Sequence, residues 1–221
     1  MLLNYLCSNF LEESAFAETC GVSLNELCCL MDRRVFPAPS YVYESNGRSV
    51  SFVSDFQEDA TYRFHLRGYK AWIDAISRFE LDTEEHARCY FFNRYEIAKQ
   101  TFLASEHGRK LAEVAPDIPE QFNSGHADMT WENFLKGVYG VCTRDGQPES
   151  VFLKQAGVMF IEELTSAGPG SLATPELQLL AKAVTLLDSV ESEFAPHEAL
   201  HASRQRCIVD VQSKFLDKAA A

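Results

Sequence analysis

The chain has 221 residues, of which 46% are hydrophobic and 24% are charged. This length and apolar content suffice for one large domain or two small ones, and the composition excludes global disorder. Its 32 acidic residues outnumber its 20 basic ones and give a formal net charge of -12. Binding to DNA depends on Lys and Arg side chains that neutralise phosphates, so this charge balance argues against DNA as a partner.

No apolar run reaches the ~18 residues that a membrane-spanning helix needs, so we expect no membrane segment. The start of the chain, MLLNYLCSNFLEES, lacks the basic stretch of a signal peptide. The seven cysteines form no C-x-x-C pair, and an odd number without an export signal favours reduced thiols. These features together predict a cytoplasmic protein.

The first forty residues contain the signals of two short helices. A helix is predicted over 9–19 and ends at Gly21. Ser23 then caps a second helix, and Glu26 completes a capping box three residues later. Pro37 ends this second helix because proline lacks a backbone N–H.

A β-hairpin is predicted over 41–56, with its turn at Ser-Asn-Gly (45–47). Two helices followed by a hairpin resemble the MerR-type winged helix-turn-helix, whose second helix reads a promoter. The chemistry differs from that family, because 11–41 holds five acidic residues and only two basic ones, and Arg48 is alone in the hairpin. We therefore favour a structural or protein-binding use of this unit, with DNA contact as the alternative.

The remainder of the chain is predicted to be helical, apart from an irregular connection over 109–128. We expect a mainly α protein in which a winged helix-turn-helix-like unit (1–60) precedes a helical bundle (61–221). The helices expected after residue 60 cover 67–79, 82–107, a segment capped by Thr130, 148–164, 174–194 and 202–217.

Two segments hold the candidate ligand-binding residues. Within 131–154, Arg144 has the two parallel donors that hold a carboxylate or a phosphate, and Tyr139 lies nearby in the sequence. The alternative is that Arg144 is solvated or bonded to helix carbonyls. Within 194–206, a structural or anion-binding role is expected for His197, Ser203 and Arg204.

The same C-terminal segment contains the pattern H-E-x-x-H at 197–201, which on a helix presents His197 and His201 to a zinc ion with Glu198 as the base. The 20 residues that follow offer no evident third ligand. We expect no cofactor, and zinc is the alternative.

Cys142 is a weaker candidate nucleophile, because it needs a neighbouring base and only His126, His197 and His201 are candidates.

A set of short segments follows a distinctive order along the chain, at 4–6, 39–41, 68–72, 134–144 and 194–204. Their order resembles a bacterial family classed as a domain of unknown function, whose members are labelled natural-product biosynthesis proteins. The resemblance implies a cytosolic accessory protein and carries no catalytic residue. We expect the chain to bind a small acidic metabolite or a partner enzyme. The alternatives are a MerR-like regulator and a metal-dependent hydrolase.

Overall fold

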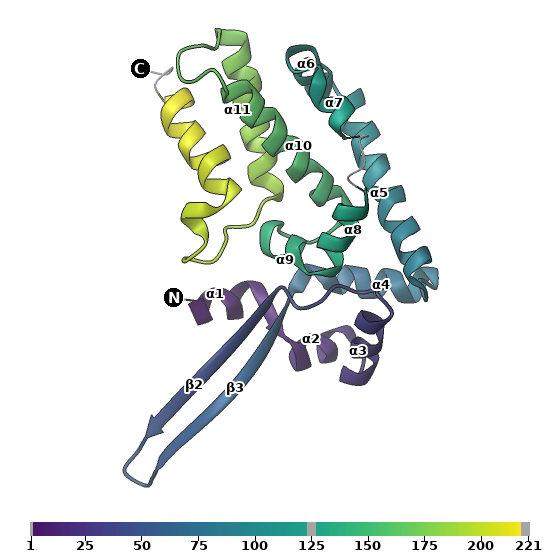
Figure 1. The fold of residues 1–221 in the computed structure, drawn as a ribbon, viewed down its shortest axis with the longest axis vertical. Coiled ribbons are helices and arrows are strands. Elements are labelled where there is room, and N and C mark those ends of the chain that lie inside the picture. The colour runs from purple at the N-terminus through teal and green to yellow at the C-terminus, as the bar shows by residue number, and fades with distance from the viewer. Residues whose placement is uncertain (1, 123–126, 218–221) are drawn as a thin grey trace.

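The structure is a computed structural model that describes residues 2–122 and 127–217. Most of these residues are helical, and a three-stranded antiparallel sheet lies in the N-terminal part. The prediction of a mainly helical chain with a β-hairpin is therefore confirmed. Figure 1 shows the long helices on one side of the N-terminal elements and the hairpin projecting away on the other.

The N-terminal part begins with two helices separated by a short strand, where one helix over 9–19 was predicted. That prediction is wrong because residues 10–12 pair with the distant strand β3 before the next helix begins. The predicted caps are confirmed: Gly21 ends a helix with φ 70°, and Ser23 and Glu26 form the capping box. The elements are α1 (Leu2–Asn9), β1 (Phe10–Glu12), α2 (Glu13–Cys20) and α3 (Leu24–Asp32).

The hairpin is longer than predicted. Its strands β2 (Tyr41–Val50) and β3 (Asp55–Leu66) pair without interruption from Tyr41–Phe64 to Val50–Asp55, so the Asn-Gly pair lies inside β2 and not in the turn. The turn covers 51–54, where the Ser51 hydroxyl accepts hydrogen bonds from the backbone N–H groups of Val53 and Ser54. The local turn preference of Asn-Gly is thus overridden by the pairing of two long strands.

The bundle contains more helices than the sequence suggested. The helix predicted over 82–107 ends at Ala104, because the Ser105 hydroxyl accepts from Gly108 N–H at 3.0 Å and caps a new helix. Two helices therefore occupy the start of the segment that was predicted to be irregular. The helices are α4 (Lys70–Phe79), α5 (Glu84–Ala104), α6 (Glu106–Val114), α7 (Asp117–Gln121), α8 (Ala127–Leu135), α9 (Val138–Cys142), α10 (Pro148–Thr165) and α11 (Thr174–Val190).

Two further boundaries differ from the prediction. Thr130 lies inside α8 and is buried, so it does not cap that helix, and α11 stops at Val190 instead of near residue 194. The C-terminal helical segment contains two π-helical turns, and short 3-10 turns precede α4 and the C-terminal segment. These turns are η1 (Arg67–Tyr69), η2 (Ala199–His201), η3 (Gln205–Val209) and η4 (Gln212–Leu216).

One hydrophobic core joins the N-terminal elements to the bundle. The buried Trp72 donates from its indole N–H to the carbonyl of Val35 at 2.8 Å. Arg34 bridges Glu84 and Glu132 on two bundle helices. The predicted boundary at residue 60 falls within β3. Over the described residues, no helix combines the length and the apolar character that crossing a bilayer requires.

Candidate functional site

Arg144 and Arg204, which are far apart in the sequence, meet at Asp188 in the last turn of α11. Arg144 donates from Nε and Nη2 to the backbone carbonyl of Asp188 at 3.2 and 3.0 Å. The Nη2 atom of Arg204 lies 2.6 Å from the Oδ1 atom of Asp188. Both guanidinium groups therefore lie at a helix C-terminus, where the helix dipole favours positive charge.

Glu191, the residue that follows α11, is completely buried. Its backbone pairs with that of Thr143, and its Oε1 atom accepts from the Ser203 hydroxyl and lies 3.8 Å from Lys154 Nζ. Burial raises the pKa of Glu191, while the Ser203 hydrogen bond and the charge of Lys154 lower it. Its Oε2 atom has no hydrogen-bond partner within the described ranges.

A cleft of about 270 Å³ opens beside Arg144, and we call it the Arg144 cleft. Its walls come from the N-terminal elements and from the helical bundle. The two parts approach closely at Gly140, because a Cβ atom there would lie 2.0 Å from the hydroxyl oxygen of Ser40. The residues that line the cleft are Tyr5, Asn9, Phe10, Leu66, Gly140, Thr143, Arg144, Ser192 and Glu193.

Of the five predicted ligand residues, Arg144 alone is among the described residues that line this cleft. Ser203 and Arg204 do not line it and bond instead to Glu191 and Asp188, respectively. Tyr139 is buried in the bundle, where its hydroxyl accepts from Gln155 Nε2 at 3.1 Å. The His197 side chain is 58% exposed and lies 3.8 Å from Glu198. The five residues thus do not form one binding surface.

The H-E-x-x-H pattern does not lie on an α-helix. His197 and Glu198 lie in a turn, and only Ala199–His201 forms a 3-10 turn, so the expectation of two imidazoles on one helix face is wrong. Glu198 instead accepts from the Tyr41 hydroxyl at 2.6 Å. Within residues 2–122 and 127–217, no group of three His, Cys, Asp or Glu side chains is placed to hold a metal ion.

Cys142 lacks the environment of a catalytic nucleophile. It is buried, and this burial raises the pKa of its thiol, an effect that Lys154 only partly opposes. A nucleophilic cysteine needs the opposite shift. His126, one of its candidate bases, lies outside the described residues.

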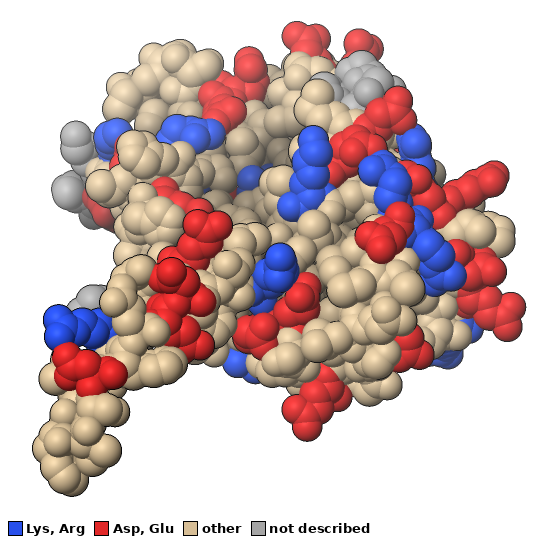
Figure 2. Space-filling view, turned by 60° about the horizontal axis from the view of Figure 1, so that its bottom comes forward, with Lys and Arg blue, Asp and Glu red and all other residues tan. Residues whose placement is uncertain are grey.

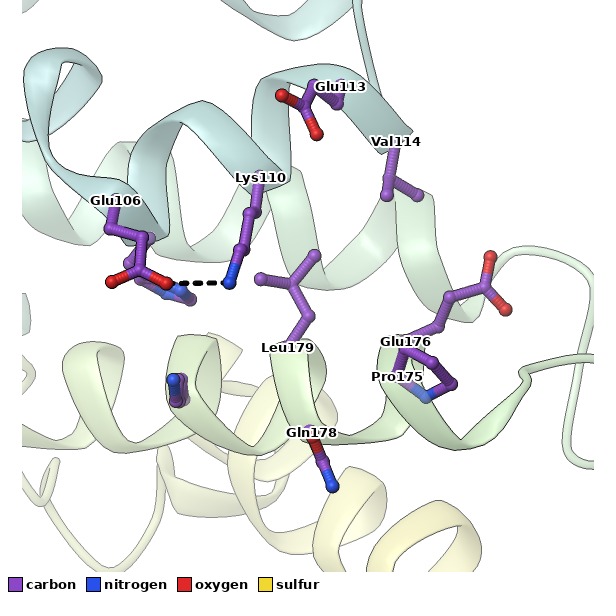
Figure 3. A pocket seen from close by; sticks show the side chains of 10 residues that line it. Glu106, Lys110, Glu113, Val114, Pro175, Glu176, Gln178 and Leu179 are labelled. Atoms are coloured by element: carbon purple, nitrogen blue, oxygen red, sulfur yellow. Dashed lines mark hydrogen bonds and ion pairs between the residues drawn. The ribbon is translucent and has the colours of Figure 1, made fainter.

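A second cavity of about 470 Å³ lies between α6 and α11 (Figure 3). Glu106 and Lys110 form an ion pair at its edge, with 2.6 Å between Oε1 and Nζ. Both ring nitrogens of His107 are buried without a hydrogen-bond partner in the described part of the chain, and burial lowers the pKa of this imidazole. Acidic and basic side chains are mixed in its wall, so this cavity favours neither anions nor cations.

The sequence prediction missed Asp188 and Glu191, the two acids that organise the site. A signal for them exists, because negative charge at the C-terminal end of a helix is unfavourable unless cations lie nearby. Asp188 in the last turn of α11 therefore indicates a basic partner, although the sequence does not show which one.

Residues 87–216 match the family described as "Family of unknown function (DUF6058)". The match includes Arg144, Asp188, Glu191 and Arg204, and it begins after the hairpin. Neither a curated protein nor a solved structure matches the chain. Because the matched residues make up more than half of the sequence, the chain belongs to this family of unknown function.

Proposed function

We propose that this chain is a cytosolic accessory protein that binds a small acidic metabolite in the Arg144 cleft. One observation carries the proposal: Arg144 is held in a fixed orientation at the wall of the cleft by its two hydrogen bonds to Asp188. Its Nη1 group has no partner among the described residues. A guanidinium that is oriented in advance binds a carboxylate or a phosphate with little further loss of side-chain entropy.

The other walls of the cleft restrict the ligand. A volume of about 270 Å³ suits a small molecule. Glu193, which is exposed in the same wall, would repel a second negative charge. Tyr5 and Phe10 supply an aromatic wall. The favoured ligand therefore has one anionic group beside Arg144 and an apolar or neutral remainder.

The biosynthetic setting rests on the resemblance to proteins labelled for natural-product biosynthesis. That setting favours a metabolite or its biosynthetic enzyme as the partner. The cytosolic location is part of the same proposal and rests on the same resemblance.

Calorimetric titration at low salt tests the proposal, with benzoate, acetate and phenyl phosphate as probes. We expect benzoate to bind, and Arg144→Ala to weaken its binding by roughly tenfold or more, as expected for the loss of a charged hydrogen-bond donor. Acetate, which lacks an apolar remainder, and phenyl phosphate, which carries a second negative charge beside Glu193, should bind more weakly. Arg206→Ala is the matched control, because Arg206 is an exposed arginine paired with Glu162 outside the cleft. The absence of binding by the unmodified protein, or an equal loss in the control, would contradict the proposal.

A MerR-like regulator is the second candidate, supported by the order of α2, the Gly21 turn, α3 and the hairpin. Its chemistry is unfavourable, since α3 contains no basic residue and Arg34, just after it, is paired with Glu84 and Glu132. A gel-shift experiment at low salt tests it, because a genuine DNA complex should weaken strongly as salt is added. The structure gives the hydrolase alternative no support, because His197 and His201 do not lie on one α-helix.

A further inference from the structure

The β2–β3 hairpin extends from the body of the protein with its outer edge unpaired. The strand order is β1-β3-β2, so β2 is an edge strand, and β1 covers only the last residues of β3. Figures 1 and 2 show the hairpin projecting into solvent. Its apolar side chains are exposed, with Val42 at 59%, Val50 at 67%, Phe52 at 102% and Phe56 at 59%.

A hairpin of this kind is unusual for a monomer. Two strands without a third are only marginally stable in water, and an open edge invites pairing with another chain. Monomeric proteins protect such edges with lysine, proline or a bulge. The strand β2 contains neither lysine nor proline, and its register with β3 is unbroken from Tyr41 to Val50.

The sequence of β2 is self-complementary when the strand is read against itself in the antiparallel direction. With Asn46 opposite its own copy, Glu44 lies opposite Arg48, and Val42 lies opposite Val50. These side chains alternate along the strand and therefore share one face. We propose that β2 pairs antiparallel with β2 of a second copy of this chain, about a two-fold axis at Asn46, and forms a four-stranded sheet.

Charge complementarity selects this register. Only this pairing places Glu44 directly opposite Arg48, and the two-fold axis creates that ion pair twice. Glu44 forms no ion pair within the described structure. Arg48 pairs with Asp55 at 2.5 Å, but both side chains are more than half exposed, so Arg48 is free to turn toward a second partner.

This register also allows favourable packing on the other face of the sheet. Ser49 of one copy lies opposite Tyr43 of the other, and Ser49 is flanked on its own chain by Phe56. The small serine leaves room for the aromatic rings of Tyr43 and Phe56 to approach across it. The same register places Phe52 at the base of the partner hairpin, where Tyr41 packs against Tyr5.

Charge reversal tests the register. Sedimentation velocity of the full chain from about 1 to 100 µM should show a weak dimer, because the paired area is small. Glu44→Arg and Arg48→Glu should each raise the dissociation constant about tenfold or more, since each variant places like charges opposite one another twice. The double variant Glu44→Arg/Arg48→Glu should return the dissociation constant to within about threefold of the original, because the two ion pairs are re-formed in reverse.

The substitutions should not affect folding, because both residues are exposed on the projecting hairpin. The circular dichroism spectrum of each variant should therefore be unchanged. A monomer at the highest concentration would overturn the proposal. So would a dimer that ignores the single changes, or a double variant that stays dissociated. Dimerisation is independent of the Arg144 cleft, so either proposal can fail alone.

A second experiment tests the position of the axis. Under mild oxidation, Asn46→Cys should form a disulfide-linked dimer, because the two copies of this position face each other. Ser45→Cys is the matched control, because position 45 faces position 47 of the second copy. Peptide mass spectrometry identifies the linked position against the seven native cysteines. Equal cross-linking at both positions would exclude this register.

Discussion

Arg204 and Asp188 form the ion pair that joins the C-terminal segment to α11, with Nη2 and Oδ1 2.6 Å apart. The Arg204 side chain is only 22% exposed, and its Nη1 group is buried without a hydrogen-bond partner within the described ranges. The carbonyl of the same Asp188 holds Arg144. One residue thus connects the loop after α9 and the C-terminal segment to a single helix end.

Replacing Asp188 with Asn should lower the free energy of unfolding by about 1–2 kcal/mol. This loss lies between the small cost of breaking an exposed ion pair and the larger cost of breaking a buried one. The cause is that Arg204 would remain largely buried without its counter-charge. Urea unfolding at pH 7 measures the loss. Asp74→Asn is the control, because Asp74 forms an exposed ion pair with Lys70 and should change stability by less than about 0.5 kcal/mol. Equal losses would show that the Asp188 pair is not special.

Glu191 should make stability fall as pH rises above the ordinary range of a glutamate. Burial raises its pKa in the folded state, so between the unfolded and folded pKa values the folded chain binds more protons than the unfolded chain. Stability is therefore gained as pH falls through the folded pKa and levels off below the unfolded one. Urea unfolding from pH 4 to pH 8 should show this decrease in stability with rising pH, and Glu191→Gln should reduce it.

Glu193→Gln, which changes an exposed neighbour two residues away, is the matched control and should keep the slope. A slope that persists in Glu191→Gln would assign the pH dependence to another group.

The features of the fold that could be predicted are those encoded by adjacent residues. The capping box of Ser23 and Glu26 and the proline at the start of α10 each depend on a few neighbouring positions, and the structure confirms them. The Asn-Gly turn failed because strand pairing of distant residues decides whether that local preference is used. The break at Ser105 was missed because Gly108 had to be recognised as a close contact, where a Cβ would lie 2.1 Å from the Phe102 carbonyl oxygen.

In the candidate site, too, local chemistry could be predicted and contacts between distant residues could not. Arg144 was recognised by its chemistry, and it lines a cleft. Its partner Asp188 is brought to it by the packing of α11 against α10, which no local pattern records. The pairing of Ser203 with Glu191 likewise depends on where the C-terminal segment folds back. Residue type therefore indicates which side chains can bind an anion, and tertiary structure decides which of them remain available.

Gly146 should tolerate alanine poorly. Its φ of +68° is unfavourable for an alanine, and a Cβ atom there would lie 2.2 Å from the ring of the buried Tyr69. We expect Gly146→Ala to lower the free energy of unfolding by roughly 2–4 kcal/mol, which combines backbone strain with a steric clash. Gly168→Ala is the matched control, because Gly168 also has a positive φ but faces open space, so only the strain of about 1 kcal/mol remains. Similar losses in chemical denaturation would mean that Tyr69 moves aside.

The seven cysteines should react with a thiol reagent such as DTNB in three groups. Cys7, Cys28, Cys29 and Cys89 are exposed and should react first, and Cys20 is half-buried and should follow. Cys142 and Cys207 are buried, and burial raises the pKa of Cys207 to about 12, so little thiolate is present at pH 8. These two should react only on unfolding in urea. Cys142→Ser should leave the fast phases unchanged and remove one equivalent from the urea-dependent phase. Fast labelling of Cys142 in the folded protein would instead show that the core around Glu191 opens readily to solvent.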